Sequence, residues 1–154
     1  LVIDIRDNPG GNLDTVVEML RQILPEGVIV TTKDRDGTAE EYTCDGAHEF
    51  TKPLAVLVNG SSASASEVFA AAVKDYGIGT IVGETTFGKG VVQDVIGLRD
   101  GSSVKITTAE YFPPSGESIN KKGVKPDVEI EFEQDPDDPE ADNQLEKALE
   151  IVEQ

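Results

Sequence analysis

A run of serines in the middle of the chain stands where acyl-transfer chemistry could occur. Ser61-Ser62-Ala63-Ser64-Ala65-Ser66-Glu67 follows the apolar run Leu54–Val58 and precedes apolar residues at helical spacing. Amide groups at a helix N-terminus lack partners within the helix, and the helix dipole favours negative charge there. A serine in this position is a candidate nucleophile, because the tetrahedral intermediate of acyl transfer carries an oxyanion. Position alone favours an N-capping role for Ser64 or Ser66, because serines before helices are usually N-caps.

Two glycines near the start of the chain could complete such a site. Asn8-Pro9-Gly10-Gly11 is a turn signal directly after the β-branched run Leu1–Ile5, which predicts a buried strand. Glycine lets the backbone approach a substrate closely because it has no side chain. We therefore expect the amide of Ala65 to supply one oxyanion donor and that of Gly10 the second, with Gly11 as the alternative.

A serine nucleophile also needs a base. The only histidine, His48, lies in a polar segment, which argues against a Ser-His-Asp triad. A lysine can serve only when neutral, and at its ordinary pKa of about 10.4 roughly one amine in 2,500 is uncharged at pH 7. The site must therefore be dry and lack a carboxylate beside the amine. Lys89, between Gly88 and Gly90 and before Val91-Val92, fits this requirement better than the lysines of polar turns.

The hydrophobic pattern alternates between strands and helices along the chain. The expected strands are Leu1–Ile5, Val28–Thr32, Glu40–Thr43, Leu54–Val58, Thr80–Val82, Val104–Thr108 and Val128–Ile130. The expected helices carry apolar positions from Leu13 to Leu24 before Pro25, from Val68 to Tyr76 before Gly77, and from Leu145 to Val152. This alternation predicts an α/β fold.

Charge restricts the class of partner. The formal net charge is -17 at pH 7, which argues against nucleic acid or an anionic membrane surface as a partner. Positions 129–154 hold eleven acidic residues and one lysine, a composition typical of a solvated surface and tail. No stretch approaches the roughly 20 apolar residues of a membrane span.

Metal and disulfide chemistry have little support in the sequence. Cys44 is the only cysteine, so no disulfide can form within the chain and the redox compartment stays undetermined. Cys44 and His48 are two potential zinc ligands without nearby partners, whereas structural zinc sites use four ligands. We therefore expect no metal and no cofactor.

Several ordered blocks of the sequence resemble the C-terminal processing (tail-specific) peptidases, serine peptidases of family S41. The serine run and Phe87-Gly88-Lys89-Gly90-Val91-Val92-Gln93 are similar to the two active-site motifs of that family. The segment 4–11 resembles its oxyanion-hole turn, and segments 111–119 and 123–128 resemble its downstream strand and loops. The resemblance covers about residues 1–130.

This resemblance implies a role for individual residues. Ser64 corresponds to the nucleophile, Lys89, which follows it by 25 residues, to the base, and Gln93 to a residue that orients the lysine. Asp75 falls where some members carry an aspartate linked to activity, although a residue at a helix end can equally act as a cap. Residues four apart lie about 13 Å from each other in a strand but are neighbours on a helical turn. We therefore predict that 89–93 turns rather than extends.

The resemblance also implies a fold and a setting. It implies a ClpP/crotonase-like core of repeated β-β-α units over residues 1–133, with an acidic linker and amphipathic helix over 134–154 packed on the same domain. It further implies cleavage of protein or peptide substrates near their C-termini, in the bacterial cell envelope. Members usually carry an upstream PDZ domain, and this chain opens inside a strand, so we expect it to be a fragment of a longer parent chain. Formation of a homo-oligomer stays open.

Two other functions fit part of the sequence. Residues 83–89 satisfy the pattern G-x-x-x-x-G-K after a strand, which is most of a nucleotide-binding P-loop. Gly90, however, stands where a serine or threonine would reach magnesium, and no long helix is expected to follow. The second alternative is a non-catalytic peptide-binding or assembly module. The presence of Ser64, Lys89 and Gln93 argues against a degenerate site, whereas the upstream region that we expect to be missing favours this alternative.

Overall fold

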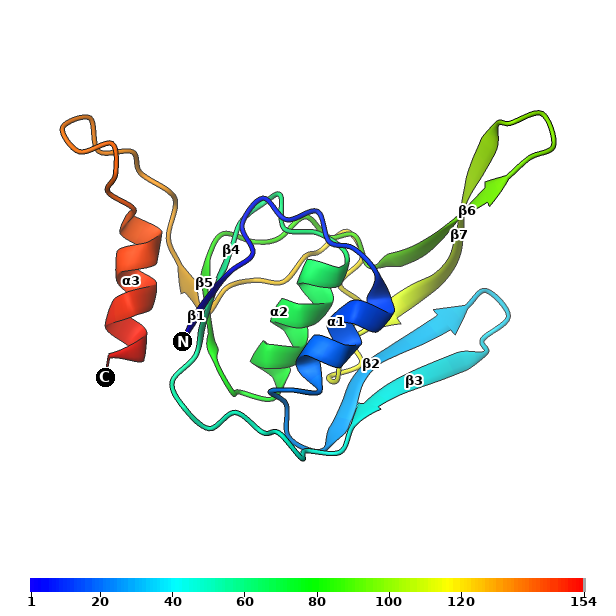
Figure 1. The fold of residues 1–154 in the computed structure, drawn as a ribbon, viewed down its shortest axis with the longest axis horizontal. Helices are drawn as coiled ribbons and strands as arrows, with labels where there is room; N and C mark the ends of the chain where they lie inside the picture. The colour runs from blue at the N-terminus through cyan, green and yellow to red at the C-terminus, as the bar shows by residue number, and fades with distance from the viewer. Residues whose placement is uncertain (154) are drawn as a thin grey trace.

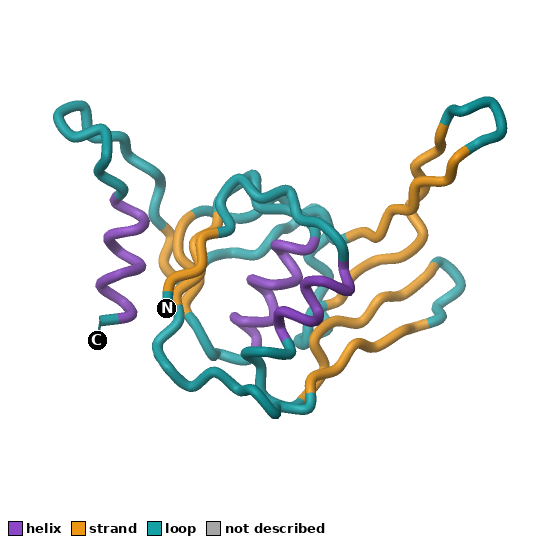
Figure 2. Tube along the Cα trace, viewed as in Figure 1, coloured by secondary structure: helices purple, strands orange, loops and turns teal. Residues whose placement is uncertain are grey.

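The computed structural model describes residues 1–153, which form two four-stranded sheets and three helices (Figures 1 and 2). In chain order the elements are β1 (Val2–Asp4), α1 (Leu13–Leu20), β2 (Gly27–Asp34), β3 (Ala39–Cys44), β4 (Ala55–Val58), α2 (Ala65–Asp75), β5 (Thr80–Gly83), β6 (Val91–Gly97), β7 (Ser103–Phe112), β8 (Val128–Glu129) and α3 (Asn143–Val152). This order confirms the predicted mixed α/β character.

The parallel sheet β1-β4-β5-β8 is covered on both faces. Val56 and Val58 of β4 pack into the cluster around α1 and α2, whereas Ala55 and Leu57 pack toward Ala148 of α3. Figure 1 shows α1 and α2 on one side of this sheet and α3 on the other. The uninterrupted apolar run of β4 follows from this burial, because a parallel strand covered on both faces needs no polar alternation.

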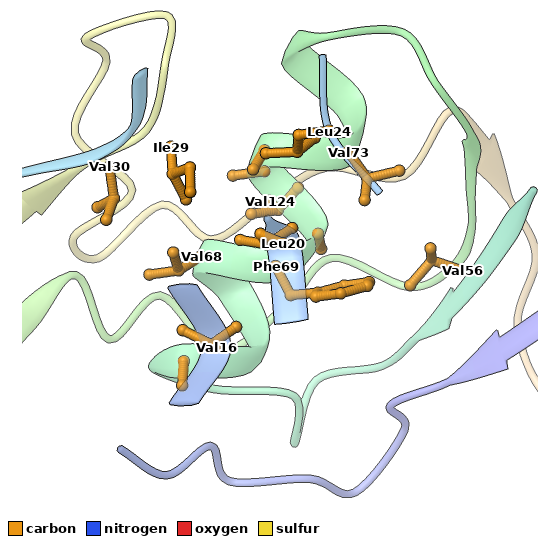
Figure 3. Close-up of a cluster of buried hydrophobic side chains, with 14 of the residues drawn as sticks. Val16, Leu20, Leu24, Ile29, Val30, Val56, Val68, Phe69, Val73 and Val124 are labelled. Atoms are coloured by element: carbon orange, nitrogen blue, oxygen red, sulfur yellow. The ribbon is translucent and has the colours of Figure 1, made fainter. Parts of the chain in front are cut away.

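The main core lies where α1 and α2 meet (Figure 3). Every residue of α2 from Ala65 to Val73 is buried, so this helix is enclosed on all sides. The helix α1 stops at Leu20, earlier than the apolar positions up to Leu24 indicated, and two tighter turns follow it. This early end has a local cause, because the ring of Pro25 would clash with the helical carbonyl four residues before it, that of Arg21.

Loops at the carboxyl ends of three adjacent strands carry the predicted site residues. β1 leads into the turn with Gly10, β4 leads into the run with Ser64, and β5 leads into the loop with Lys89. These strands are parallel neighbours in the order β1-β4-β5, so their carboxyl ends lie along one edge of the sheet. Ligand sites of open α/β sheets form preferentially at this edge.

The antiparallel sheet β3-β2-β7-β6 forms two hairpins that extend away from the helices (Figure 1). β6 pairs with β7 along its whole length, with a β-bulge between Val92 and Gln93. The prediction that 89–93 turns is therefore wrong, because the chain is extended from Val91 onward. Pairing with the long β7 supplies the backbone hydrogen bonds that keep this segment extended, and the segment by itself does not reveal that pairing. The bulge still bends the strand beside Gln93.

Arg6 fastens the C-terminal helix to the beginning of the chain. Its guanidinium donates to Asp142 Oδ1 at 3.1 Å and to Oδ2 at 2.7 Å, and it also bonds Asp4 and the buried Gln144. Asp142 is in addition the N-cap of α3. Hydrogen bonds from Arg6 hold the pKa of Asp142 below its usual value. The acidic segment thus ends in a specific docking contact, while the domain boundary at residue 133 stays a prediction.

The variant Asp142→Asn tests this contact, because asparagine keeps the cap and removes the charge that faces Arg6. We expect a loss of about 1–2 kcal/mol in the free energy of unfolding at pH 7, measured by urea denaturation. The folded-state pKa of Asp142 lies below the unfolded value, which is near 3.9, so the charge stabilises the fold above that pH. This contribution is lost as the pH falls through the folded-state pKa. The difference between wild type and variant should therefore shrink below about pH 4.

Asp138→Asn is the matched control. Asp138 is an exposed aspartate of the same segment, and within residues 1–153 its carboxylate accepts only from the Glu140 amide. This variant should change stability by less than about 0.5 kcal/mol. Equal losses in the two variants would contradict the docking role of the ion pair.

Candidate active site

Ser64 occupies a constrained backbone position at the start of α2. It is the N-cap of that helix, has φ 58° and ψ -118°, and is only 7% exposed. A residue with a side chain seldom adopts this φ, and holding it costs about 1–3 kcal/mol. Surrounding contacts must therefore fix the conformation, and such positions concentrate at functional sites.

The carboxylate of Glu67 supplies those contacts. Glu67 is fully buried, and its Oε2 accepts from Ser64 N at 2.9 Å and from Lys89 N at 2.7 Å. Its Oε1 accepts from Thr86 Oγ1 and from Gly88 N, each at 2.6 Å. One side chain therefore joins the backbone of the serine to the loop that carries the lysine.

The sequence analysis did not identify Glu67 as a site residue. The signal was present, because Ser64-x-x-Glu67 before an apolar run is the pattern of a capping box. That pattern predicts the bond between Glu67 and the Ser64 amide, which the structure contains. It does not predict the bonds to Gly88 and Lys89, which come from a loop more than twenty residues away.

The structure brings the backbones of Ser64 and Lys89 together. Both amide nitrogens donate to the same oxygen of Glu67, so they lie within about 6 Å of each other. Lys89 is half-buried, and within residues 1–153 its amine forms no ion pair with a carboxylate. A serine hydroxyl and an amine of this kind are the two groups that lysine-assisted acyl transfer uses.

The loop around Lys89 is incompatible with a P-loop. Gly88 has φ 86°, and a side chain on Gly90 would lie 2.5 Å from the Asn120 nitrogen, so both glycines serve tight packing. The amides of Gly88 and Lys89 donate to Glu67 and are not free to bind phosphate. The strand β6 follows this loop where a P-loop requires a helix. The nucleotide-binding alternative is therefore wrong.

Gly10 lies directly against the start of α2. A methyl group on it would stand 2.7 Å from Ala65 N and 2.9 Å from Ser64 Cβ, and its φ is 89°. Only glycine fits here, as the predicted oxyanion turn requires. Gly11 has open space around the same position. The Gly10 amide itself donates to Asn8 Oδ1 at 2.9 Å.

Tyr111 is a further residue at this site that the sequence did not single out. Burial raises the pKa of Tyr111, and the nearby Ser64 side chain partly offsets that rise. Its backbone amide donates to Gly90 O at 2.9 Å. The phenol therefore lies beside the serine, while its backbone supports the loop that holds Lys89.

Gln93 and Asp75 are engaged elsewhere. The Gln93 side-chain amide donates to Thr107 Oγ1 at 3.2 Å across the β6–β7 hairpin. Asp75 ends α2 and accepts from Ser115 N at 2.9 Å. Ten residues of helix separate it from the Ser64 end, about 15 Å at 1.5 Å per residue. Asp75 contacts a loop rather than the serine, and the orienting role of Gln93 stays a prediction.

An apolar cavity of about 220 Å³ opens beside the serine. Gly10 and Ala65 border it, and its walls include Ile3, Ile5, Val16, Met19 and Phe69. These walls offer apolar surface with no charged side chain. The cavity therefore suits an apolar group held next to Gly10 and Ala65.

Neither a metal-binding cluster nor a membrane-crossing helix occurs in the described part of the chain. Residues 1–153 contain no group of three or more His, Cys, Asp or Glu side chains that could hold a metal ion. None of their helices is long and apolar enough to cross a membrane.

Comparison with known proteins agrees with the peptidase-like site. The family model for Peptidase family S41 matches residues 1–130, so the chain belongs to this family of serine peptidases. It is 47% identical over 139 residues to the chloroplastic C-terminal processing peptidase of Tetradesmus obliquus, covering 90% of this chain and 30% of that protein. It is 44% identical over 130 residues to the carboxyl-terminal-processing protease of Synechocystis sp. (strain ATCC 27184 / PCC 6803 / Kazusa), covering 84% and 30%.

A solved structure shares the fold. The photosystem II D1 C-terminal processing protease aligns with a TM-score of 0.80 and 43% identity, over 100% of this chain and 39% of that one. The chain spans about three tenths of the length of the curated relatives that it matches. These findings confirm the family resemblance, and the similar proteins include bacterial and chloroplastic processing proteases.

Glu67→Gln tests the joining role of the buried carboxylate. Glutamine keeps the shape but replaces one acceptor oxygen with an NH₂ group, which would face amide donors that it cannot satisfy. We expect a loss of about 2–4 kcal/mol in the free energy of unfolding, measured by urea denaturation. Faster hydrogen exchange at the Lys89 amide should accompany it. Glu84→Gln, a half-buried glutamate of the same loop, is the control. Equal effects of both variants would contradict the assignment.

Proposed function

We propose that this chain carries the hydrolytic site of a serine endopeptidase, with Ser64 as nucleophile and Lys89 as general base. The observation that supports this most is the Glu67 oxygen shared by the amides of Ser64 and Lys89. A base must come within hydrogen-bond reach of the proton that it removes, and this shared acceptor keeps the backbone amides of the two residues within about 6 Å of each other.

The proposed reaction has two halves. Neutral Lys89 takes the hydroxyl proton as Ser64 Oγ bonds to the substrate carbonyl carbon, and the amides of Ala65 and Gly10 (or Gly11) hold the oxyanion. The intermediate collapses, the C–N bond breaks, and the Lys89 ammonium gives its proton to the leaving amine. Water then loses a proton to Lys89 and attacks the acyl-enzyme, and that proton returns to Ser64 Oγ when the acid product leaves.

Two supporting residues belong to the proposal. We assign Gln93 to orienting the lysine, which requires its side chain to leave Thr107. The bulge next to Gln93 supports such a change, because it interrupts the ladder there. Asp75 supports the site only from a distance, by holding the loop at Ser115.

The apolar cavity indicates which substrate residue precedes the cleaved bond. It adjoins both proposed oxyanion donors, Gly10 and Ala65, so the side chain of an acylating residue would enter it. Its apolar walls favour an aliphatic or aromatic side chain, because burying an unpaired charge there is costly.

The wider setting is inferred from the family. We propose protein substrates cut near their C-termini, a parent chain with a PDZ domain, a ClpP/crotonase-like core and a bacterial cell-envelope location. Relatives named as carboxyl-terminal processing proteases support the proposed cleavage near substrate C-termini.

Covalent labelling tests the nucleophile and the base together. A fluorophosphonate probe should modify Ser64, located by peptide mass spectrometry, and Ser64→Ala should not react. Lys89→Ala should slow labelling about 10²- to 10⁴-fold, the range typical of a lost general base. Lys33→Ala is the control, since the Lys33 amine lies over the Phe112 ring in the antiparallel sheet. Unchanged labelling in Lys89→Ala would contradict the lysine base, and no labelling of the wild type at all would favour the non-catalytic module.

A second test addresses the cavity. Two peptidyl phosphonates can differ only in the residue attached to the phosphonate, leucine or lysine. The leucine probe should label Ser64 at least about tenfold faster than the lysine probe. Met19→Glu places a carboxylate on the cavity wall and should reduce this ratio. Equal rates with both probes on the wild type would exclude the cavity as the binding site of that residue.

A further inference from the structure

The second oxyanion donor is already occupied in this structure. The Gly10 N–H donates to Asn8 Oδ1 at 2.9 Å, so it cannot also donate to a substrate oxygen. The Ala65 N–H donates no hydrogen bond within residues 1–153, so this donor is available. The proposed oxyanion hole therefore has one available donor and one that is satisfied by a neighbouring side chain.

Geometry favours Gly10 over Gly11 as the donor that must be released. Gly10 packs so closely on the start of α2 that a methyl group on it would lie 2.7 Å from Ala65 N. Gly11 has no atom within 4 Å of the corresponding position. Two donors converge on one oxyanion only when they lie side by side, and Gly10 and Ala65 do so.

The Asn8 side chain can rotate while the backbone of the turn stays in place. The Asn8 carbonyl accepts from Ala63 N at 3.0 Å and from Ser66 Oγ at 3.1 Å, so its backbone is fixed to α2. The side chain is exposed, and the bond to Gly10 is its single hydrogen bond within residues 1–153. Asn8 also borders the apolar cavity, so a bound substrate would contact it.

We propose that, before substrate binds, the Asn8 side-chain carbonyl accepts the hydrogen bond from the Gly10 N–H that the oxyanion would later accept. The Asn8 side chain must then rotate away when substrate binds. Asn8 is then a positioning residue that sets the reactivity of the site without touching the reacting bond. This inference rests on the proposed serine peptidase function and concerns the regulation of that same site. A neutral amide oxygen is a weaker acceptor than an oxyanion, so the exchange favours the charged intermediate.

Amide hydrogen exchange tests the contact without any catalysis. Asn8→Ala should make the Gly10 amide of the ¹⁵N-labelled chain exchange at least about threefold faster, because one protecting bond is lost. Asn12→Ala is the matched control. Asn12 lies in the same turn, but its Oδ1 accepts from Thr15 N and caps α1, so its loss should leave the Gly10 rate unchanged. An unchanged Gly10 rate in Asn8→Ala would overturn the proposal.

Binding of a peptidyl boronate tests the functional consequence. The boronate forms a tetrahedral adduct with a serine hydroxyl and places an oxygen in the oxyanion hole. Asn8→Ala frees the Gly10 donor and should bind it about two- to tenfold more tightly than wild type, the range expected for one hydrogen bond. Asn8→Asp should bind at least about tenfold more weakly near neutral pH, because a carboxylate holds the donor and repels the adduct. This loss should recover as the carboxylate is protonated toward pH 4.

The outcomes separate this inference from the function on which it rests. Wild-type binding that Ser64→Ala abolishes, with Asn8→Ala no tighter than wild type, would overturn the role of Asn8 and leave the nucleophile standing. Absence of any Ser64-dependent adduct in the wild type would overturn the proposed function and this inference together. The pH-dependent recovery in Asn8→Asp is a response that a purely structural effect would not produce.

Discussion

The carboxylate of Glu67 is fully buried, forms no ion pair within residues 1–153, and accepts four hydrogen bonds. Removing such a charge from water costs several kcal/mol, and the four charge-assisted bonds together with the N-terminal dipole of α2 offset that cost. One bond comes from the Ser64 amide, and the other three come from Thr86, Gly88 and Lys89 in the loop after β5. The carboxylate is stable only when the Ser64 turn and the Lys89 loop are both in place, and this mutual requirement couples them.

The strand order makes that coupling available. Parallel pairing of β1, β4 and β5 brings the ends of three strands to one edge of the sheet, and each end continues into a segment of the site. The burial of β4 on both faces fixes the position of the Ser64 turn relative to the segments that follow β1 and β5. The contact between Arg6 and Asp142 adds a second anchor to the segment that leads into the Gly10 turn.

Local patterns were informative where one segment decides its own structure. The buried run at β4, the capping sequence at Ser64 and the glycine turn after β1 could each be read from a few residues. The family motifs added Ser64 and Lys89 as a pair. The strand β6 could not be predicted in this way, because its extension depends on pairing with β7, whose partner positions lie six to nineteen residues further on.

The sequence by itself determined which chemical groups are available: a serine at a helix start, glycines that permit close approach, and one lysine in a loop with few alternatives as a base. Tertiary structure alone decided how these groups are held and which are free. The Glu67 bonds to a distant loop and the Asn8 bond that occupies Gly10 both depend on ångström-scale distances. Hydrogen bonds weaken steeply with distance and angle, so such contacts exist only once the packed chain fixes their geometry.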